Sequence, residues 1–136
     1  MSTQTTRGSC LCGAVSYQIQ GPYHFFQYCH CGRCRKASGS SNAANLMIPA
    51  ANLTWLTGES LTKQYKLPAA ERFSTRFCTQ CGSRLPWTTP NGEFVIVPAG
   101  SLDEEPESLP QRHIYWGSRP HWCSTMDALP KFDEVQ

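Results

Sequence analysis

The sequence contains few of the large apolar residues that usually fill a protein core. Leu, Ile, Val and Phe together make 24 of the 136 residues, slightly below the ~20% under which a chain of high net charge is expected to be disordered. The net charge here is only +2, and 15 residues are Phe, Trp or Tyr. We therefore expect a folded protein whose small core is supplemented by another stabilising interaction.

Long apolar runs are also absent. No 18 consecutive apolar residues occur, so we expect no membrane-spanning helix. The first ten residues, MSTQTTRGSC, contain no apolar segment of the kind found in secretory signals, so we expect a cytoplasmic protein. The 12 Lys and Arg nearly balance the 10 Asp and Glu, which gives no reason to expect nucleic acid or a membrane surface as a partner.

No segment keeps an apolar repeat of 3.6 residues for more than about two turns, and short alternating segments occur instead. Val15, Tyr17 and Ile19 share one face of a predicted strand. Phe94–Val97 (FVIV) is typical of a buried strand, and the Pro90-Asn91-Gly92 turn would pair it with Arg84–Thr88. The pattern predicts an all-β protein, and the length suits a single domain over residues 1–136 with an ordered core of about 7–132.

Eight cysteines are the most unusual feature of the composition, at positions 10 and 12, 29, 31 and 34, 78 and 81, and 123. In a reducing compartment such cysteines favour metal sites over disulfides. Side chains two residues apart in a strand point to the same side, with Cα atoms about 6.6 Å apart. Both thiolates can then bind one zinc ion at about 2.3 Å, whereas a disulfide between such close neighbours would be strained.

The simplest partition of the cysteines joins the pairs into one closed site of Cys10, Cys12, Cys78 and Cys81. Gly82, directly after the last of them, suits a tight turn because glycine tolerates positive φ. Such a site would connect distant segments and stabilise the small core. Spacing alone leaves other partitions open, because any four of the eight cysteines could share an ion.

The triplet Cys29, Cys31 and Cys34 would then supply three ligands and an open fourth position, as in catalytic zinc sites. Cys123 or His30 could instead complete this site and make it structural. His30 lies between two predicted ligands, and we expect its side chain to point to the opposite face and pack beside the site.

Basic residues surround the triplet: Arg33, Arg35 and Lys36. Three thiolates on one zinc ion carry a net negative charge, which these side chains could offset, or they could bind carboxylates of a substrate. The alternative is that they are ordinary solvated charges of a loop.

Three cysteine motifs and two later segments stand out when they are read together. The motifs are Gly8–Gly13 (GSCLCG), Cys29–Lys36 (CHCGRCRK) and Phe77–Gly82 (FCTQCG). The later segments are Ala99–Asp103 (AGSLD) and the C-terminal part with His113-Ile114-Tyr115, Trp122 and Asp127–Phe132 (DALPKF). In this order, over residues 7 to about 132, they resemble the glutathione-dependent formaldehyde-activating (GFA) enzyme family, which also includes the domain of centromere protein V.

This resemblance implies the β-tent fold, in which small twisted antiparallel sheets are stapled by zinc. It implies two zinc ions per chain, a structural one on Cys10, Cys12, Cys78 and Cys81 and a catalytic one on Cys29, Cys31 and Cys34. The implied activity is that of a carbon–sulfur lyase acting on a small thiol or thiol–aldehyde adduct, such as the formation of S-hydroxymethylglutathione from glutathione. A non-enzymatic zinc-binding interaction module and a zinc hydrolase on the same scaffold are the alternatives.

We expect two zinc ions per chain in protein prepared under reducing conditions, because seven of the cysteines occur in pairs or a triplet. Cys123 has no neighbouring cysteine and is predicted to be a free thiol, so Cys123→Ser should retain both ions. Elemental analysis of protein purified without chelators measures this ratio. A ratio near one after reconstitution with zinc would contradict the second site, and loss of an ion in Cys123→Ser would make Cys123 a ligand.

Overall fold

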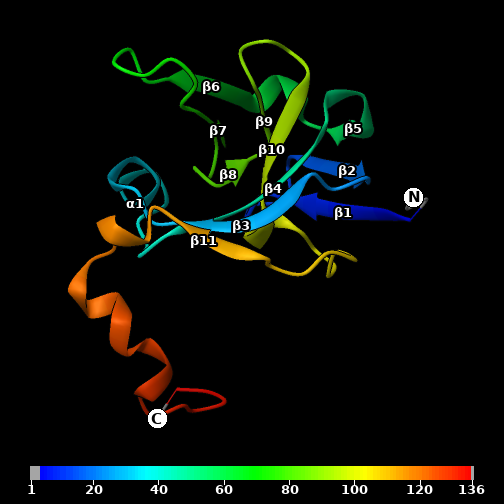
Figure 1. Ribbon diagram of the computed structural model, residues 1–136. Helices are drawn as coiled ribbons and strands as arrows, with labels where there is room; N and C mark the ends of the chain where they lie inside the picture. Colours follow the sequence, from blue (N-terminus) through cyan, green and yellow to red (C-terminus); the bar gives the residue numbers. More distant parts are fainter. Residues whose placement is uncertain (1–3, 136) are drawn as a thin grey trace.

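The computed structural model describes residues 4–135 of the chain. Within that range three small sheets, mostly antiparallel, make up the body, and a single short α-helix lies at its edge (Figure 1). The prediction of an all-β protein built from small antiparallel sheets is confirmed. None of the described helices is long and apolar enough to cross a membrane.

The first sheet contains the strand predicted around Tyr17. Its order is β1-β2-β5, with β1 at Thr5–Ser9, β2 at Ser16–Gln20 and β5 at Leu53–Thr57. Val15, Tyr17 and Ile19 are completely buried, as their alternation predicted. This face of the sheet therefore forms one wall of the core.

The second sheet is the largest and forms the centre of the molecule (Figure 1). Its order is β11-β3-β4-β10-β9, the strands being Arg112–Ile114, Phe25–Cys29, Ala43–Pro49, Phe94–Pro98 and Trp87–Thr88. All pairs are antiparallel except β11 with β3. Leu46 and Ile48 of β4 and Val95 and Val97 of β10 are buried, so the buried strand predicted at Phe94–Val97 is confirmed.

The third sheet, in the order β6-β7-β8, corrects one predicted hairpin. Its strands are Thr62–Lys66, Ser74–Cys78 and Arg84–Leu85. Arg84–Thr88 was expected to pair as one strand with Phe94–Val97, but only Trp87–Thr88 does so, while Arg84–Leu85 pairs with β7. Pro86 lies between the two pieces and has no N–H to donate to a ladder, so the chain changes sheets there.

The helix α1, at Gly32–Ser38, was not predicted. None of its residues is buried, so it has no apolar stripe from which a sequence could reveal it. Its ends are set locally instead: Cys31 Sγ accepts a hydrogen bond from the N–H of Cys34, and Gly39 ends the helix in the left-handed conformation at φ 66°. The sequence pattern therefore missed the element that carries part of the cysteine triplet.

Five 3₁₀ segments complete the described chain. They are η1 at Ala50–Asn52, η2 at Glu59–Leu61, η3 at Ala99–Ser101, η4 at Trp116–Ser118 and η5 at His121–Ala128. The chain around η5 extends away from the three sheets (Figure 1).

The close approach of Gly8 to the Tyr17 ring gives a test of this packing. A Cβ atom on Gly8 would lie 2.3 Å from Cζ of Tyr17. That ring is fixed, because it is buried and its hydroxyl lies 2.5 Å from Oγ of Ser101. Gly8→Ala should therefore lower the free energy of unfolding by about 1–3 kcal/mol, measured by urea denaturation.

Gly117→Ala is the matched control for Gly8→Ala. A Cβ atom on Gly117 meets nothing within 4 Å, so the change should stay within about 0.5 kcal/mol of the unmodified protein. Equal stabilities of the two variants would contradict the tight packing of Gly8 on Tyr17.

Candidate metal centres and the cavity between them

Four cysteines from two distant turns come together in the structure. Cys10 and Cys12 lie between β1 and β2, while Cys78 ends β7 and Cys81 lies in the turn before β8. Their Sγ atoms all lie within 4.8 Å of one another, with Cys10 to Cys12 at 3.6 Å and Cys12 to Cys78 at 3.9 Å. Sulfur atoms at about 2.3 Å from a tetrahedral zinc ion are about 3.8 Å apart, so the donor set fits zinc.

The two turns that carry these cysteines have the same construction. The N–H of Gly13 donates to the carbonyl of Cys10 at 3.0 Å, and the N–H of Gly82 donates to the carbonyl of Cys78 at 2.8 Å. Both glycines have positive φ, 80° and 77°, as the sequence predicted for Gly82. The N–H of Gln80 also points at Cys78 Sγ, at 3.4 Å, and such donors stabilise a thiolate.

Ser83 contacts both turns and lowers the pKa of one thiol in the cluster. Its hydroxyl oxygen accepts a hydrogen bond from the N–H of Leu11 at 2.9 Å and lies 3.3 Å from Cys81 Sγ. This contact lowers the pKa of the Cys81 thiol to about 5. One member of the cluster is therefore ready to bind a cation as a thiolate at neutral pH.

The triplet Cys29, Cys31 and Cys34 also converges, with all three Sγ atoms within 4.8 Å of one another. Cys29 ends β3, Cys31 caps α1, and Cys34 lies in the first turn of that helix. The hydrogen bond with Cys34 lowers the pKa of Cys29 to about 6, and the same contact raises the pKa of Cys34 far above its usual range. One thiolate is thus stable within the triplet, but removing all three protons needs a cation, and zinc suits these ligands.

His30 is turned away from the triplet, in agreement with the prediction that it packs beside the site. Its side chain is 2% exposed, and its Nε2 lies 2.8 Å from Nδ1 of His113. The ring also contacts Trp116, with centroids 4.9 Å apart. Burial, and then the charge of His113, lower the pKa of His30. Among the described residues, neither His30 nor the buried Cys123 belongs to a group that could hold a metal.

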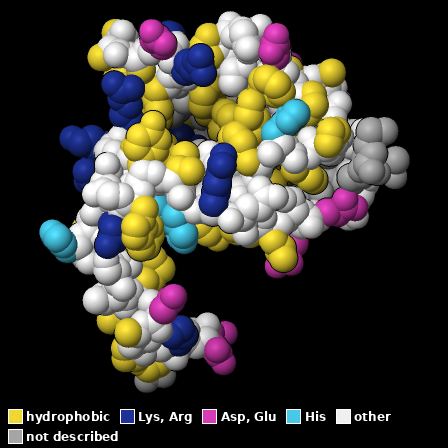
Figure 2. Space-filling model, in the orientation of Figure 1, with side chains coloured by type: hydrophobic (Ala, Val, Ile, Leu, Met, Phe, Trp, Pro, Cys, Tyr) yellow, Lys and Arg dark blue, Asp and Glu magenta, His cyan; other side chains and the backbone are white. Residues whose placement is uncertain are grey.

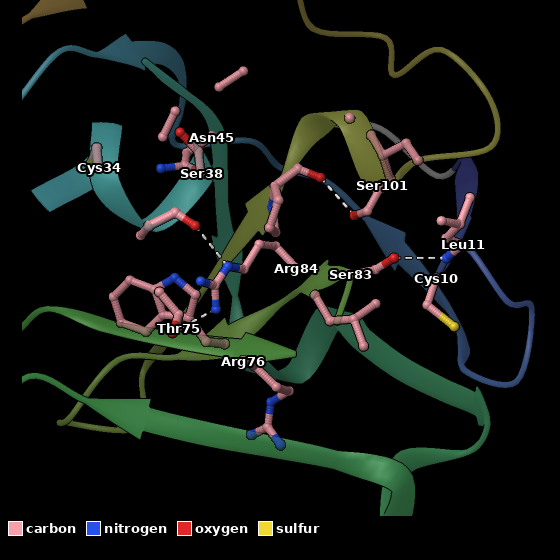
Figure 3. A pocket seen from close by; sticks show the side chains of 18 of the residues that line it. Cys10, Leu11, Cys34, Ser38, Asn45, Thr75, Arg76, Ser83, Arg84 and Ser101 are labelled. Atoms are coloured by element: carbon pink, nitrogen blue, oxygen red, sulfur yellow. Dashed lines mark hydrogen bonds between the residues drawn. The ribbon is translucent and has the colours of Figure 1, made fainter. Parts of the chain in front are cut away.

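A cavity of about 770 Å³ extends between the two cysteine groups. Cys34 lines it at one end and Cys10 at the other, as Figure 3 shows. Its walls come from α1, β4, β7, β8 and η3. The four-sulfur cluster has a full set of zinc ligands, whereas the triplet has three, of which Cys34 lines the cavity.

The three basic residues that the sequence placed near a substrate do not line this cavity. Arg33 and Lys36 are exposed, and Arg35 is half-buried. Their binding of substrate carboxylates stays a prediction. On the face in Figure 2, Lys and Arg side chains border the hollow region near α1, while Asp and Glu side chains lie toward the periphery.

Three charged residues of the cavity were missed from the sequence, Arg76, Arg84 and Asp103. Arg84 belongs to the short strand β8, and its place beside α1 depends on the pairing of β8 with β7. Asp103 accepts a hydrogen bond from the hydroxyl of Ser9 at 2.6 Å, across most of the chain. Asp103 ends the AGSLD segment of the family resemblance, but no local pattern around these residues indicates that they line a cavity.

Comparisons with known proteins find the family that the cysteine motifs resemble. Residues 5–118 match the model of a family described as glutathione-dependent formaldehyde-activating enzyme. A Halomonas elongata protein provisionally named a glutathione-dependent formaldehyde-activating enzyme is 29% identical over 121 residues, which cover 85% of this chain and 77% of that protein. A crystal structure of a Rhodobacter sphaeroides protein has the same fold, with a TM-score of 0.61 and 21% identity over 79% of this chain and 97% of the other.

Loss of one ligand should affect stability differently at the two clusters. Cys81→Ala opens a group that joins two distant turns and includes the buried Cys10 and Cys78, so it should remove most of a free energy of unfolding of about 5–15 kcal/mol. Cys34→Ala changes a helix without buried residues and should leave most of that free energy in place. Thermal melts of the zinc-loaded variants compare them, and equal losses would contradict the different roles of the clusters.

Proposed function

Because this chain belongs to the glutathione-dependent formaldehyde-activating enzyme family, we propose that it is a zinc-dependent enzyme of the carbon–sulfur lyase type that joins glutathione to formaldehyde. The proposed product is S-hydroxymethylglutathione. Residues 1–136 would form a single domain around two zinc ions, and a cytoplasmic location would keep the cysteines reduced.

The observation that carries this proposal is the unequal surroundings of the two cysteine groups. Cys10, Cys12, Cys78 and Cys81 offer four sulfur ligands and would hold a structural zinc ion. Cys29, Cys31 and Cys34 offer three, and Cys34 lines a cavity large enough for a tripeptide. When bound there, zinc would supply Lewis acidity and favour the thiolate form of a substrate.

The reaction needs no oxidant or reductant. The sulfur of glutathione attacks the carbonyl carbon of formaldehyde, a C–S bond forms, and the carbonyl π electrons move to oxygen, which takes the proton that left sulfur. Ser38 and Asn45 lie on the Cys34 side of the cavity (Figure 3). The Ser38 hydroxyl already donates to the carbonyls of Arg35 and Asn42. The Asn45 amide would therefore orient the aldehyde oxygen by a hydrogen bond as its negative charge develops.

The lining of the cavity argues against both alternative functions, a zinc hydrolase and a non-enzymatic zinc-binding module. A hydrolase would need a general base beside the triplet. The one carboxylate among the described lining residues is Asp103, which is hydrogen-bonded to Ser9 at the Cys10 end. A purely structural protein would have no use for a three-ligand site that opens into such a cavity.

We expect zinc-loaded protein to accelerate the formation of S-hydroxymethylglutathione above the spontaneous rate, in proportion to protein concentration. Exchange spectroscopy with ¹³C-formaldehyde and glutathione measures this rate. Cys34→Ala should return it to the spontaneous rate, because it removes one of the three ligands at the cavity. An unchanged rate in that variant would contradict catalysis at the triplet.

Calorimetry separates an enzyme that binds the thiol at the metal from a protein that binds it elsewhere. Glutathione should release a proton on binding, and its affinity should rise by up to about tenfold per pH unit below the pKa of its thiol. S-methylglutathione cannot form a thiolate and should bind much more weakly. Equal binding of the two ligands would show that the metal does not anchor the sulfur.

A further inference from the structure

Arg84 lies in the cavity wall between Cys34 and Cys10 (Figure 3). Its Nε donates a hydrogen bond to the carbonyl of Ala37 at 2.9 Å, and its Nη1 donates to Oγ1 of Thr75 at 3.2 Å (Figure 3). Ala37 follows Cys34 by three residues in α1, which corresponds to a rise of about 4.5 Å. The hydrogen bond therefore fixes the guanidinium at the C-terminal end of the helical turn that begins at Cys34.

This guanidinium has an unused donor side. The structure gives no partner within the described chain to its Nη2 group, and Arg84 as a whole is exposed to the cavity and solvent. An arginine whose Nε and Nη1 are held by the protein while Nη2 remains open is already oriented to bind a carboxylate. Little additional side-chain entropy would be lost when a ligand arrives.

Arg76, the other arginine in the cavity wall, has no comparable open donor group. Its guanidinium points away from Cys34 (Figure 3) and donates to Thr62 Oγ1 at 3.0 Å and Gln64 Oε1 at 2.9 Å. It also stacks over the ring of Trp55, with Cζ 5.5 Å from the centroid. Its two Nη groups therefore serve the packing of β6 and β7, and its Nε is buried without a partner.

The opposite end of the cavity carries a negative charge. Asp103 lies there beside Ser9 and Cys10. A ligand with a net negative arm should place that arm at Arg84 and a neutral or positive arm toward Asp103. In glutathione the glycyl arm carries an unbalanced carboxylate, while the longer γ-glutamyl arm carries both an amino group and a carboxylate and is neutral overall.

We infer that Arg84 binds the glycyl carboxylate of the thiol substrate and so sets the direction in which glutathione lies in the cavity. This inference rests on the proposed function. Arg84 would then be a specificity-determining residue, because it favours thiols that carry an unbalanced carboxylate in the position of the glycyl arm.

The test measures dissociation constants by calorimetry for glutathione and for its glycyl ethyl ester, which lacks that negative charge. With the zinc-loaded protein the ester should bind about 10- to 100-fold more weakly than glutathione. In Arg84→Gln the two ligands should bind equally, because the amide can still donate to Ala37 but carries no charge. Arg84→Lys should recover part of the preference for glutathione.

Arg72→Gln is the matched control, since Arg72 is exposed in the β6–β7 connection and does not line the cavity; it should keep the full preference. If the ester binds the unmodified protein as well as glutathione does, or if Arg84→Gln weakens both ligands by the same factor, the inference is wrong while the proposed function stands. If the unmodified protein binds neither ligand, the proposed function fails together with the inference.

Discussion

The convergence of four sulfur atoms from two turns is the constraint on which the rest of the structure depends. The core contains few large apolar side chains, and Cys10 and Cys78 are themselves part of it. The cluster joins the turn after β1 to the turn after β7, and the hydrogen bond from Leu11 to Ser83 reinforces the same junction. The first and third sheets are therefore held together where hydrophobic burial alone would contribute little.

The position of the cavity follows from this junction. Because the four-sulfur cluster fixes the β7–β8 turn, the short strand β8 lies opposite α1, and Arg84 spans the gap to the carbonyl of Ala37. Cys34 of the triplet then lines a cavity that is bounded by elements from all three sheets. The four-sulfur cluster thus influences the shape of the cavity beside the triplet.

The two clusters also differ in the pKa values of their thiols. In the four-sulfur cluster the Ser83 contact lowers the pKa of Cys81 to about 5. In the triplet the thiols lower the pKa of one member to about 6 and raise that of another. Arg33, Arg35 and Lys36 stand outside the cavity, while the fixed charge of Arg84 lies within it. The positive charge that lines the cavity therefore comes from residues distant in sequence from the triplet, and not from its neighbours in α1.

The sequence by itself determined the features that depend on near neighbours. The spacing of the cysteines suggested the simplest partition into two metal sites but left others open, and the motifs identified the family. Alternation located the buried face around Tyr17, and a continuous apolar run located the buried strand around Val95. Only the tertiary structure decided that the chain changes sheets at Pro86 and that α1 forms without an apolar stripe. It also decided that Arg84 and Asp103 line the same cavity. These features depend on contacts between segments far apart in the chain, and no local propensity or periodicity records such contacts.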